Sequence, residues 1–362
     1  MDWGASGRRD TYRFTAVDPF SLDELFDVDC VPSSCGVTFG YYTDNKVQAD
    51  VRMAEESYQR MRGNLIRIGH TVEMADGNSV TEVLGTFFID SAEKDKATAG
   101  EFRECNCYST MWRLSQSLLT ADHVFHVGDS CSAGLSRLME GGGSTVILGE
   151  GVASKTHTVD GRFPMLANRL ECANEYAGWC GWQVGVDDYG RQTVNGYLPP
   201  ADRAPSYRFE DGGNCTYLPK LRESYTGELV NEVLAVWSRE KVPDPDDGFG
   251  LSGRAYVKLD SANPYSYERC GVRMTGALEF REPKSDADLL KAAQDYLDQH
   301  DAAIRYLEIE HVGIPHLRAG DTVLYTNASA GEYNVLCEIT QMSIGSLGPL
   351  MLTKSKLKVV GA

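Results

Sequence analysis

The 362-residue sequence predicts a mainly β, α+β fold: two related antiparallel β-barrel domains with an inserted small α/β domain and a small helical element. Apolar and polar residues alternate with a period of two from residue 11 to 108 and again over residues 303–362, as in half-buried strands. Helical spacing is concentrated in residues 109–205 and 285–300. The 36 glycines and 18 tyrosines suit many short strands joined by turns.

The changes between alternating and helical spacing along the sequence predict the domain boundaries. Residues 1–108 and 206–238 form the first β-barrel domain, and residues 109–205 form the inserted α/β domain. Residues 239–284 and 301–362 form the second β-barrel domain, with the helix 285–300 packed on it. A chain of 362 residues is long enough for several domains and for a core that needs no disulfides.

The first β region shows clear alternation from Val47 to Met53 and from Ile66 to Met74, where His70 shares the apolar face. The residues 76–78, Asp-Gly-Asn, predict a hairpin turn. A strand follows, with Val83 to Ile89 as its clearest part. A polar loop is expected at 94–100 and a returning strand at 101–108.

The insertion begins where helical spacing replaces alternation. Ser109 is expected to cap a helix through Trp112, and Asp129 or Ser130 to cap a second helix that stops at the glycines 141–143. A third helix is predicted over 163–177. Residues 182–197 then read as a hairpin that turns at 187–190.

The rest of the chain returns to β structure. Residues 206–238 are strand-like, residues 243–248 form a linker rich in proline and aspartate, and Ser285 caps an amphipathic helix. The last sixty residues predict four strands and three turns. In one of them Cys337 and Ile339 are expected to be buried and Glu338 exposed, although Leu336 breaks the alternation. In the last strand, lysines 354, 356 and 358 alternate with buried positions; they either guard an exposed strand edge or form a docking face for an acidic neighbour.

Charge and composition exclude several function classes. A formal net charge of −17 repels phosphate backbones, so specific nucleic-acid binding is not expected, although such a surface suits a channel through which DNA passes. There is neither a basic leader nor an apolar run of about 18 residues, so we expect no membrane segment. The ten cysteines then indicate a reducing cytoplasm and free buried thiols. The glycosylation-like residues 214–216 are interpreted as chance.

Several residue groups have the composition of a chemical site without its spacing. His123 and His126 lack a second cluster of metal ligands. Cys105 and Cys107 would share a strand face about 6.5–7 Å apart, at the upper limit for a disulfide. Cys30 with Cys35, or Cys172 with Cys180, would pair only if the fold brought them together.

Three further groups also favour structural interpretations. On a strand, Glu308 and Glu310 point away from His311, which separates a possible acid/base set. The residues 141–145 follow a helix and lack the lysine of a phosphate loop, so they predict a connector. The tryptophans that suggest a sugar platform are better explained as core residues; they are Trp112, Trp179, Trp182 and Trp237. We therefore assign no catalytic, cofactor-binding or metal-binding residue and expect no cofactor.

Several segments, in order, resemble the baseplate hub or tail-tip hub proteins of tailed bacteriophages and the N-terminal hub domain of tail-associated lysins. The strand 83–89 is similar to an LGTF-containing strand of the family, and residues 107–114 to its barrel-to-helix junction. The matching segments continue at 188–200, 217–219, 230–233 and 307–323. Their order along nearly the whole chain carries the resemblance, since each alone is a turn or strand signature.

The resemblance implies a structural, non-enzymatic role. It implies a homotrimer that caps the tail tube, matches the sixfold tube to a threefold tip and anchors the host-contact apparatus. Two similar barrels in each of three chains present six similar surfaces. The implied partners are the tail-tube or distal-tail ring, the end of the tape-measure protein, and a distal fibre, spike or receptor-binding protein. The implied location is the virion tail tip or baseplate, after assembly in the host bacterial cytoplasm.

An alternative from another class is a β-rich carbohydrate-binding module or a cell-wall glycan hydrolase. A hydrolase of that kind requires two carboxylates about 5 to 10 Å apart in a cleft. No spacing in the sequence predicts such a pair.

Overall fold

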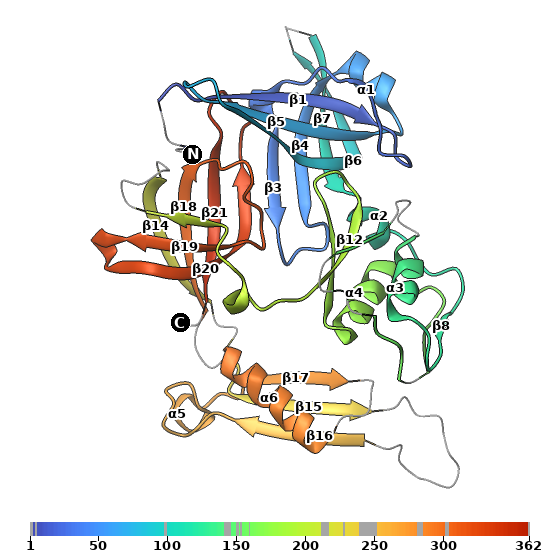
Figure 1. Cartoon of the computed structure of the whole chain (residues 1–362), viewed down its shortest axis with the longest axis vertical. Helices are drawn as coiled ribbons and strands as arrows, with labels where there is room; N and C mark the ends of the chain where they lie inside the picture. Colours follow the sequence, from blue (N-terminus) through green and yellow to red (C-terminus); the bar gives the residue numbers. More distant parts are fainter. Residues whose placement is uncertain are drawn as a thin grey trace. The chain divides into compact units, whose positions relative to one another are not determined.

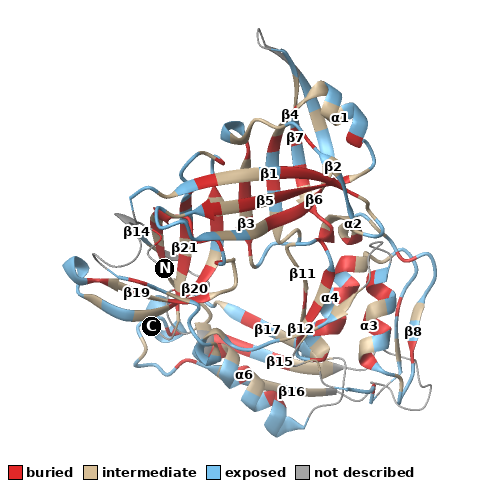
Figure 2. Cartoon of the chain, turned by 45° about the horizontal axis from the view of Figure 1, so that its top comes forward, coloured by how far each residue is buried: buried red, intermediate tan, exposed pale blue. Residues whose placement is uncertain are grey.

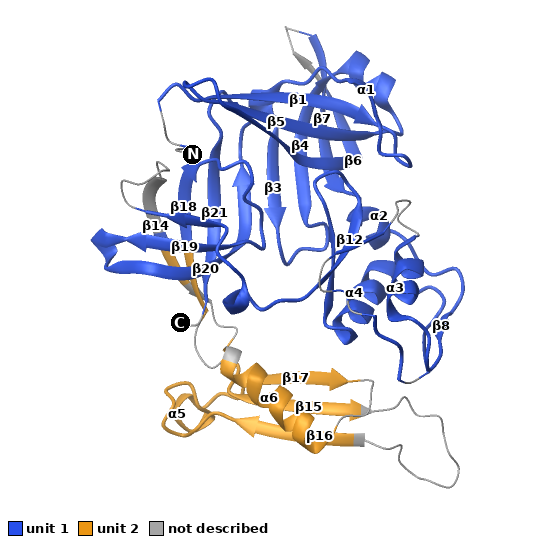
Figure 3. Cartoon of the chain, viewed as in Figure 1, with its two compact units in different colours: residues 1–222, 308–361 blue, residues 223–307, 362 orange. Residues whose placement is uncertain are grey.

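The computed structural model describes residues 3, 6–97, 100–140, 146–149, 152, 154–158, 160–210, 217–226, 229–238, 252–280, 285–300 and 304–360 (Figure 1). The predicted linker 243–248, the connector 141–145 and the glycosylation-like residues 214–216 lie outside them. The chain divides into two compact units (Figure 3). Unit 1 is residues 1–222 with 308–361, and unit 2 is residues 223–307 with 362.

One large sheet contains the strands from both ends of the sequence. Its N-terminal strands are β1 (Arg9–Val17), β2 (Glu24–Asp27), β3 (Gly36–Gly40), β4 (Val47–Ala54), β5 (Leu65–Glu73), β6 (Ser79–Ala97) and β7 (Gly100–Ser109). Its later strands are β13 (Tyr207–Phe209), β14 (Tyr217–Thr226), β18 (Ile304–Val312), β19 (Thr322–Asn327), β20 (Glu332–Ile344) and β21 (Leu352–Val359). Short helices between strands are η1 (Pro32–Ser34), α1 (Glu55–Met61), η3 (Pro200–Asp202) and η4 (Ala328–Ala330). The path runs β14-β18-β21-β20-β3-β4-β7-β6-β5-β1-β2, and β19 joins it at β20 and pairs with β13.

The mainly β, α+β class is confirmed, but the strands do not close into two separate barrels. The reason lies in β20. One edge of β20 pairs with β21, while the other pairs with β19 over Glu332–Glu338 and then with β3 over Gln341–Ile344. Because β20 is 13 residues long, it serves both groups of strands and joins them into one sheet.

From β21 through β20, β3 and β4 to β7 the register alternates buried and more accessible rows, and Figure 2 colours the buried positions red. Paired residues of neighbouring strands point to the same face. One row is buried across four strands and consists of Ile344, Val37, Ala49 and Cys107. The adjacent row is at least partly accessible and consists of Lys354, Ser343, Thr38, Gln48 and Tyr108.

The insertion has its own core. Its elements are α2 (Met111–Ser115), β8 (His123–Phe125), α3 (Cys131–Met139), β9 (Ile147–Leu148), β10 (Gly161–Phe163), α4 (Arg169–Trp179), β11 (Trp182–Val186) and β12 (Gln192–Gly196). The buried side chains of α3, α4 and the β11–β12 hairpin form one cluster, which includes Leu135, Tyr176 and Val194.

Two predictions for the insertion are confirmed and two are wrong. The Ser130 cap and the hairpin at 182–197 are present. Ser109 does not cap α2, because its hydroxyl donates to the Asn45 carbonyl and Thr110 occupies the cap position. The third helix begins at Arg169 rather than at 163, because Phe163 pairs with β8 in a strand.

Unit 2 is a three-stranded sheet covered by one helix. Its elements are β15 (Glu232–Ser238), β16 (Ser252–Lys258), α5 (Tyr267–Cys270), β17 (Thr275–Phe280) and α6 (Asp286–His300). Leu289 and Leu297 of α6 are buried with Val233 of β15, and Ser285 caps the helix as predicted.

The strand order in this unit differs from the predicted allocation. Residues 232–238 were expected in the first barrel and 239–284 in the second, yet β15 lies between β16 and β17 in one sheet. The helix predicted to pack on the second barrel packs on β15 and β16. The apolar stripe of α6 explains this, because it is buried on those strands. The other predicted boundaries stay predictions.

Candidate functional site: a polar hollow and an arginine junction

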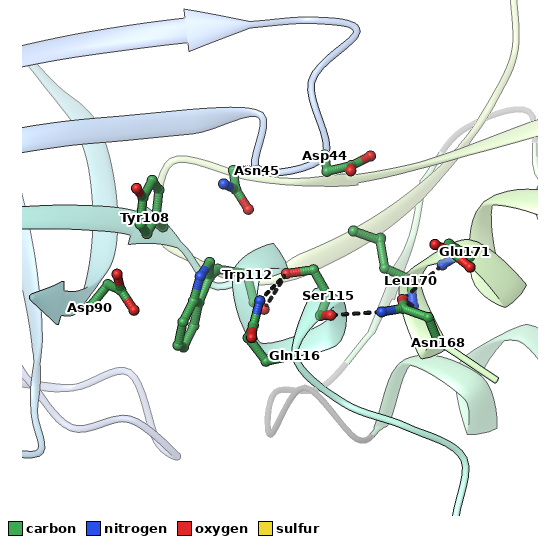
Figure 4. A pocket seen from close by; sticks show the side chains of 10 residues that line it. All are labelled: Asp44, Asn45, Asp90, Tyr108, Trp112, Ser115, Gln116, Asn168, Leu170 and Glu171. Atoms are coloured by element: carbon green, nitrogen blue, oxygen red, sulfur yellow. Dashed lines mark hydrogen bonds between the residues drawn. The ribbon is translucent and has the colours of Figure 1, made fainter. Parts of the chain in front are cut away.

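A polar hollow of about 400 Å³ lies where the insertion meets the large sheet (Figure 4). Four chain segments form it: the β3–β4 turn, strand β6, the continuous run from β7 into helix α2, and the start of helix α4. Its lining residues are Asp44, Asn45, Asp90, Tyr108, Trp112, Ser115, Gln116, Asn168, Leu170 and Glu171. It belongs entirely to unit 1.

Stacked aromatic rings form one wall. The indole of Trp112 is nearly parallel to the Phe88 ring, with centroids 5.0 Å apart, and to the Tyr108 ring at 6.3 Å. Phe88 and Tyr108 are paired residues of β6 and β7, so the sheet register brings both rings to the same face. Helix α2 starts directly after β7, which places Trp112 over them.

The opposite wall is fixed by the start of α4. The Asn168 side chain accepts hydrogen bonds from the backbone N–H groups of Leu170, at 2.9 Å, and Glu171, at 3.2 Å. Its amide nitrogen donates to the Ser115 carbonyl at 2.7 Å. One asparagine thus caps α4 and ties it to the end of α2.

Charge in the hollow is one-sided. Asp44, Asp90 and Glu171 are exposed carboxylates, and none of the ten lining residues is a lysine, arginine or histidine. Aromatic ring faces and carboxylates both attract cations. The hollow therefore has the chemistry to receive an ammonium or guanidinium group.

A second feature, the arginine junction, joins the insertion to the large sheet through the turn between β11 and β12. Arg318 donates to both carboxylate oxygens of Asp188, at 3.0 and 3.2 Å from Nε, and to the Val83 carbonyl at 2.8 Å. One guanidinium thus connects the insertion, β6 and the C-terminal part of the chain.

Arg67 and Thr86 hold the same turn from β5 and β6. The Arg67 side chain donates to the Thr86 hydroxyl at 3.0 Å and to the Tyr189 carbonyl at 3.3 Å. Thr86 donates to the Asp188 carbonyl at 3.0 Å. Gly190 is buried here with φ +85°, and a Cβ at this position would lie 3.1 Å from Thr86.

Arg203 connects a further group of segments. It donates to Glu338 of β20 at 2.9 Å, to the Gly320 carbonyl at 2.7 Å and to the Tyr41 hydroxyl at 3.1 Å. Tyr41 donates in turn to Gln183 of β11 at 2.6 Å. Side-chain alternation, helical spacing and turn residues did not predict the bonds made by Arg67, Arg203 and Arg318. Nothing in the local sequence of these arginines distinguishes them from arginines exposed to solvent.

The candidate chemical groups take structural positions. His123 is half-buried, with its pKa lowered by burial, whereas His126 is exposed and lies 3.4 Å from Asp160. Within the described part of the chain, no group of three or more potential ligands has the geometry of a metal site.

Cys30, Cys35, Cys105 and Cys107 are free thiols. Cys172 and Cys180, the other suggested pair, are not joined by a disulfide. Burial raises the pKa of Cys35 to about 11 and that of Cys105 to about 12. These two thiols are therefore in their unreactive, protonated form at neutral pH.

The predicted separation of Glu308 and Glu310 from His311 is confirmed. His311 is 2% exposed and bonds to the Val312 carbonyl and the Ser355 hydroxyl, and burial lowers its pKa to about 4. Glu310 instead lies 3.1 Å from Lys354 on the outer side.

The four tryptophans do not share a platform. Trp182 is buried in the core of the insertion, Trp179 packs against that core, and Trp237 packs in the core of unit 2. Only Trp112 lines the polar hollow. Among the described helices, none has the length and apolarity needed to cross a membrane.

No protein-family model and no curated protein matches the sequence. Solved structures do match over almost the whole chain. The tail protein from Neisseria meningitidis MC58 matches with a TM-score of 0.65 at 11% identity, covering 97% of each chain. The 43 kDa tail protein of prophage MuSo2 from Shewanella oneidensis matches at 0.57 and 12%, covering 96% of this chain and 98% of the other. Prophage tail protein gp18 from Listeria monocytogenes EGD-e matches at 0.55 and 10%, covering 96% and 94%.

At such identities the likeness establishes the fold. This chain has the fold of phage tail proteins, which confirms the resemblance stated from the sequence at that level.

Proposed function

We propose that this protein is a structural component of a phage tail: a hub of the baseplate or tail tip. The observation that carries the proposal is the extent of the fold match, since 96–97% of this chain and 94–98% of three tail proteins superimpose. Such coverage includes the insertion and the unit 2 sheet as well as the large sheet. A shared fold alone does not define a role, so the proposal requires a direct test.

In this proposal three copies form a ring that caps the tail tube and matches sixfold to threefold symmetry. The partners are a tail-tube or distal-tail ring on one side and a fibre, spike or receptor-binding protein on the other, with the end of the tape-measure protein reaching the ring. DNA passes through the ring without specific binding, in keeping with a net charge of −17. The protein resides at the virion tail tip after assembly in the host cytoplasm.

Three arginines of the sheet and insertion support a scaffold role. Arg67, Arg203 and Arg318 each bond to groups from distant parts of the sequence. These bonds stabilise the position of the insertion on the sheet, as expected of a protein that transmits force or fixes geometry. We assign no catalytic role to any residue.

The decisive experiment is the mass of the purified protein by light scattering, followed by electron microscopy. The monomer mass is 39.9 kDa, and the proposal predicts a particle of three times that mass with a ring-shaped outline. A monomer at all concentrations, with no incorporation into tails, would contradict the hub proposal.

Glycan binding is the second candidate, because Trp112 and Tyr108 line the polar hollow together with three carboxylates. It is tested with cell-wall glycan fragments by calorimetry and by a hydrolysis assay. Binding that disappears in Trp112→Ala, without loss of folding, would support this candidate over the hub.

A further inference from the structure

A small polar cavity of about 230 Å³ lies between the β3–β4 turn and the β11–β12 hairpin of the insertion. It belongs entirely to unit 1, and it shares no lining residue with the polar hollow. We call it the lysine cavity, after its half-buried lysine. Polar side chains of the turn and of both hairpin strands line it: Tyr41, Lys46, Gln183, Thr193 and Asn195.

The register of the hairpin leaves room for this cavity. Gln183 pairs with Asn195, and Gly185 pairs with Thr193, so these four residues share one face of the hairpin. The other face is buried in the core of the insertion. Gly185 lines the cavity without a side chain, and a Cβ there would lie 3.1 Å from the Thr193 hydroxyl. A larger side chain at position 185 would therefore occupy space that the cavity now offers.

Lys46 brings a positive charge to the cavity. One N–H of its ammonium group donates to the Tyr41 carbonyl at 2.8 Å. Within the described residues, no carboxylate lies within ion-pair distance of this ammonium group. Burial lowers the pKa of Lys46, and the more distant charge of Asp44 opposes that shift. An anion in the cavity would offset the cost of burying the charge, and two N–H groups remain to bind it.

The backbone holds Lys46 in an uncommon conformation. Its φ is +58°, in the left-handed region that residues with a side chain rarely adopt. The turn fixes this conformation, because the Lys46 N–H donates to the Thr43 carbonyl at 3.2 Å and its carbonyl accepts from Gly40 at 2.7 Å. Unfavourable backbone conformations of this kind are concentrated at binding and active sites. The conformation of the turn therefore also points to a site at Lys46.

The other charges that line the cavity are paired with each other. Arg318 and Asp188 form the ion pair of the arginine junction, 3.0 Å apart, and backbone carbonyls accept other N–H groups of Arg318. Two positive charges and one negative charge line the cavity, which leaves a net charge of +1. Asp44, two residues before Lys46, lines the polar hollow instead. The charge available to a ligand is therefore that of Lys46.

The lysines of β21 differ from Lys46 in this respect. The expectation that they guard a sheet edge is wrong, because β21 lies between β18 and β20. Lys354 lies 3.1 Å from Glu310, and Lys358 pairs in register with Glu338. Carboxylates of the same chain thus lie beside two lysines of this strand. The interpretation of the strand as a docking face stays a prediction.

Uncharged donors complete the lysine cavity. The Tyr41 hydroxyl accepts a hydrogen bond from Arg203 at 3.1 Å, so its own proton is donated to the Gln183 side-chain oxygen, at 2.6 Å. The amide nitrogen of Gln183 is then available to a ligand. The side chains of Thr193 and Asn195 also make no hydrogen bond within the described chain. An ammonium group, two amides and a hydroxyl thus surround a space smaller than the roughly 300 Å³ of the smallest common ligand pockets.

We propose that the lysine cavity binds a carboxylate group. The single net positive charge matches the single charge of a carboxylate, whose two oxygens accept from the ammonium and amide N–H groups. The carboxylate belongs either to a small free acid or to an acidic side chain of a partner protein. Because the turn and the hairpin both line the cavity, a bound carboxylate connects the large sheet to the insertion. This site is independent of the proposed hub function.

Protection of Lys46 from acylation tests the site. A trace of an amine-acylating reagent labels the folded protein at neutral pH, in acetate or in chloride of equal ionic strength, and mass spectrometry measures the rate for each lysine peptide. We expect acetate to slow the labelling of Lys46 by about tenfold when its concentration is about ten times Kd, as single-site occupancy requires. Lys291 is the internal control, since it is exposed and pairs with Asp295. Its rate should change by less than about twofold.

Two variants distinguish the cavity from a general effect of charge. Gly185→Val fills the cavity with a residue that suits a strand and should abolish the protection of Lys46 by acetate. The matched control is Gly69→Val in β5, outside the cavity, where an added Cβ has its nearest contact at 3.6 Å; it should retain the protection. Thr193→Val removes one donor at similar volume and should weaken acetate binding by about threefold. Circular dichroism verifies folding, and Thr193→Val keeps the test valid if Gly185→Val does not fold.

The source of the carboxylate is tested with two capped glycine peptides, one with a single glutamate and one with glutamine in its place. Tighter protection by the glutamate peptide than by acetate assigns the site to a partner's acidic side chain, and tighter protection by acetate assigns it to a free acid. Equal Lys46 rates in acetate, glutamate peptide and chloride would overturn the proposal. Protection by phosphate alone, or protection that persists in folded Gly185→Val, would also overturn it. None of these results affects the hub proposal, which depends on the mass of the particle.

Discussion

The guanidinium of Arg203 lies 2.9 Å from the carboxylate of Glu338, whose side chain is completely buried. The other carboxylate oxygen accepts a hydrogen bond from Tyr42 at 2.6 Å. A buried charge is tolerated when its partners replace the lost water. Glu338 satisfies that condition through residues from the β3–β4 turn and from the segment between β12 and β13.

Removing the Arg203 charge should therefore destabilise unit 1. We expect Arg203→Met to lower the free energy of unfolding by about 3–5 kcal/mol, because Glu338 would remain buried without its cation. Arg208→Met is the matched control; its arginine pairs with Glu210 at an exposed position, and it should cost less than about 1 kcal/mol. Urea unfolding measures both. Equal losses of unfolding free energy in the two variants would show that the buried ion pair stabilises the protein no more than the exposed pair does.

Gly190 is predicted to be intolerant of a side chain. Its φ of +85° disfavours other residues, and an added Cβ would lie 3.1 Å from Thr86 and 3.4 Å from Thr110. Gly190→Ala should cost about 2–3 kcal/mol, from backbone strain together with crowding. Gly271→Ala is the control, since Gly271 has φ +71° with open space around it, and should cost about 1 kcal/mol. Thermal unfolding of the two variants separates crowding from strain; similar losses would rule out crowding.

Stability should decrease as the pH falls from about 6.5 to about 4, and His311 is one cause. Burial lowers its pKa from 6.5 to about 4, so between these values the unfolded chain binds a proton that the folded chain does not. Stability is therefore fully present above pH 6.5 and is lost toward pH 4, by on the order of 3 kcal/mol.

His311→Gln should flatten this part of the pH dependence, as measured by urea unfolding at several pH values. His316→Gln changes an exposed histidine and should retain the original slope. An unchanged slope in His311→Gln would assign the pH dependence to other groups.

Thiol reactivity should differ strongly among the described cysteines. Cys270 is exposed, whereas Cys105 and Cys107 are buried with raised pKa values. Because the thiolate is the reactive form, alkylation at pH 8 should modify Cys270 at least about 100-fold faster than these two. Mass spectrometry of each cysteine peptide in the folded protein measures the rates. Comparable rates at Cys105 would mean that the β4–β7 region opens readily.

The local structure was largely predictable from alternation and turn chemistry. The four closing strands, the 182–197 hairpin and the alternating burial in β21 follow from side-chain period and turn residues. His70 was expected on the apolar face, and it is fully buried, with its ring nitrogen 2.7 Å from Asp10. An alternation of apolar and polar residues with a period of two predicts which side chains are buried. The tertiary fold determines which group a buried polar side chain contacts.

The joining of the strands was not predictable in the same way. Glu338 was expected to be exposed and is buried, because β20 exchanges one partner strand for another along its length and Arg203 arrives from a distant segment. For the same reason the sheet does not separate into two closed barrels. The polar hollow was also missed, since its residues come from four segments with no common local pattern.

The pairing of β3 with β20 has a consequence for synthesis. Thr38 and Ser343 bond across this pair although 305 positions separate them in the sequence. At about 5–20 residues per second, a ribosome that has made β3 needs roughly 15 to 60 seconds to make β20. During this time the edge of β3 that later pairs with β20 has not met its partner strand. That edge is open to pairing with other nascent chains on the same messenger RNA. We therefore expect the yield of native protein to depend on chaperone supply and on translation speed more than on the final stability of the fold.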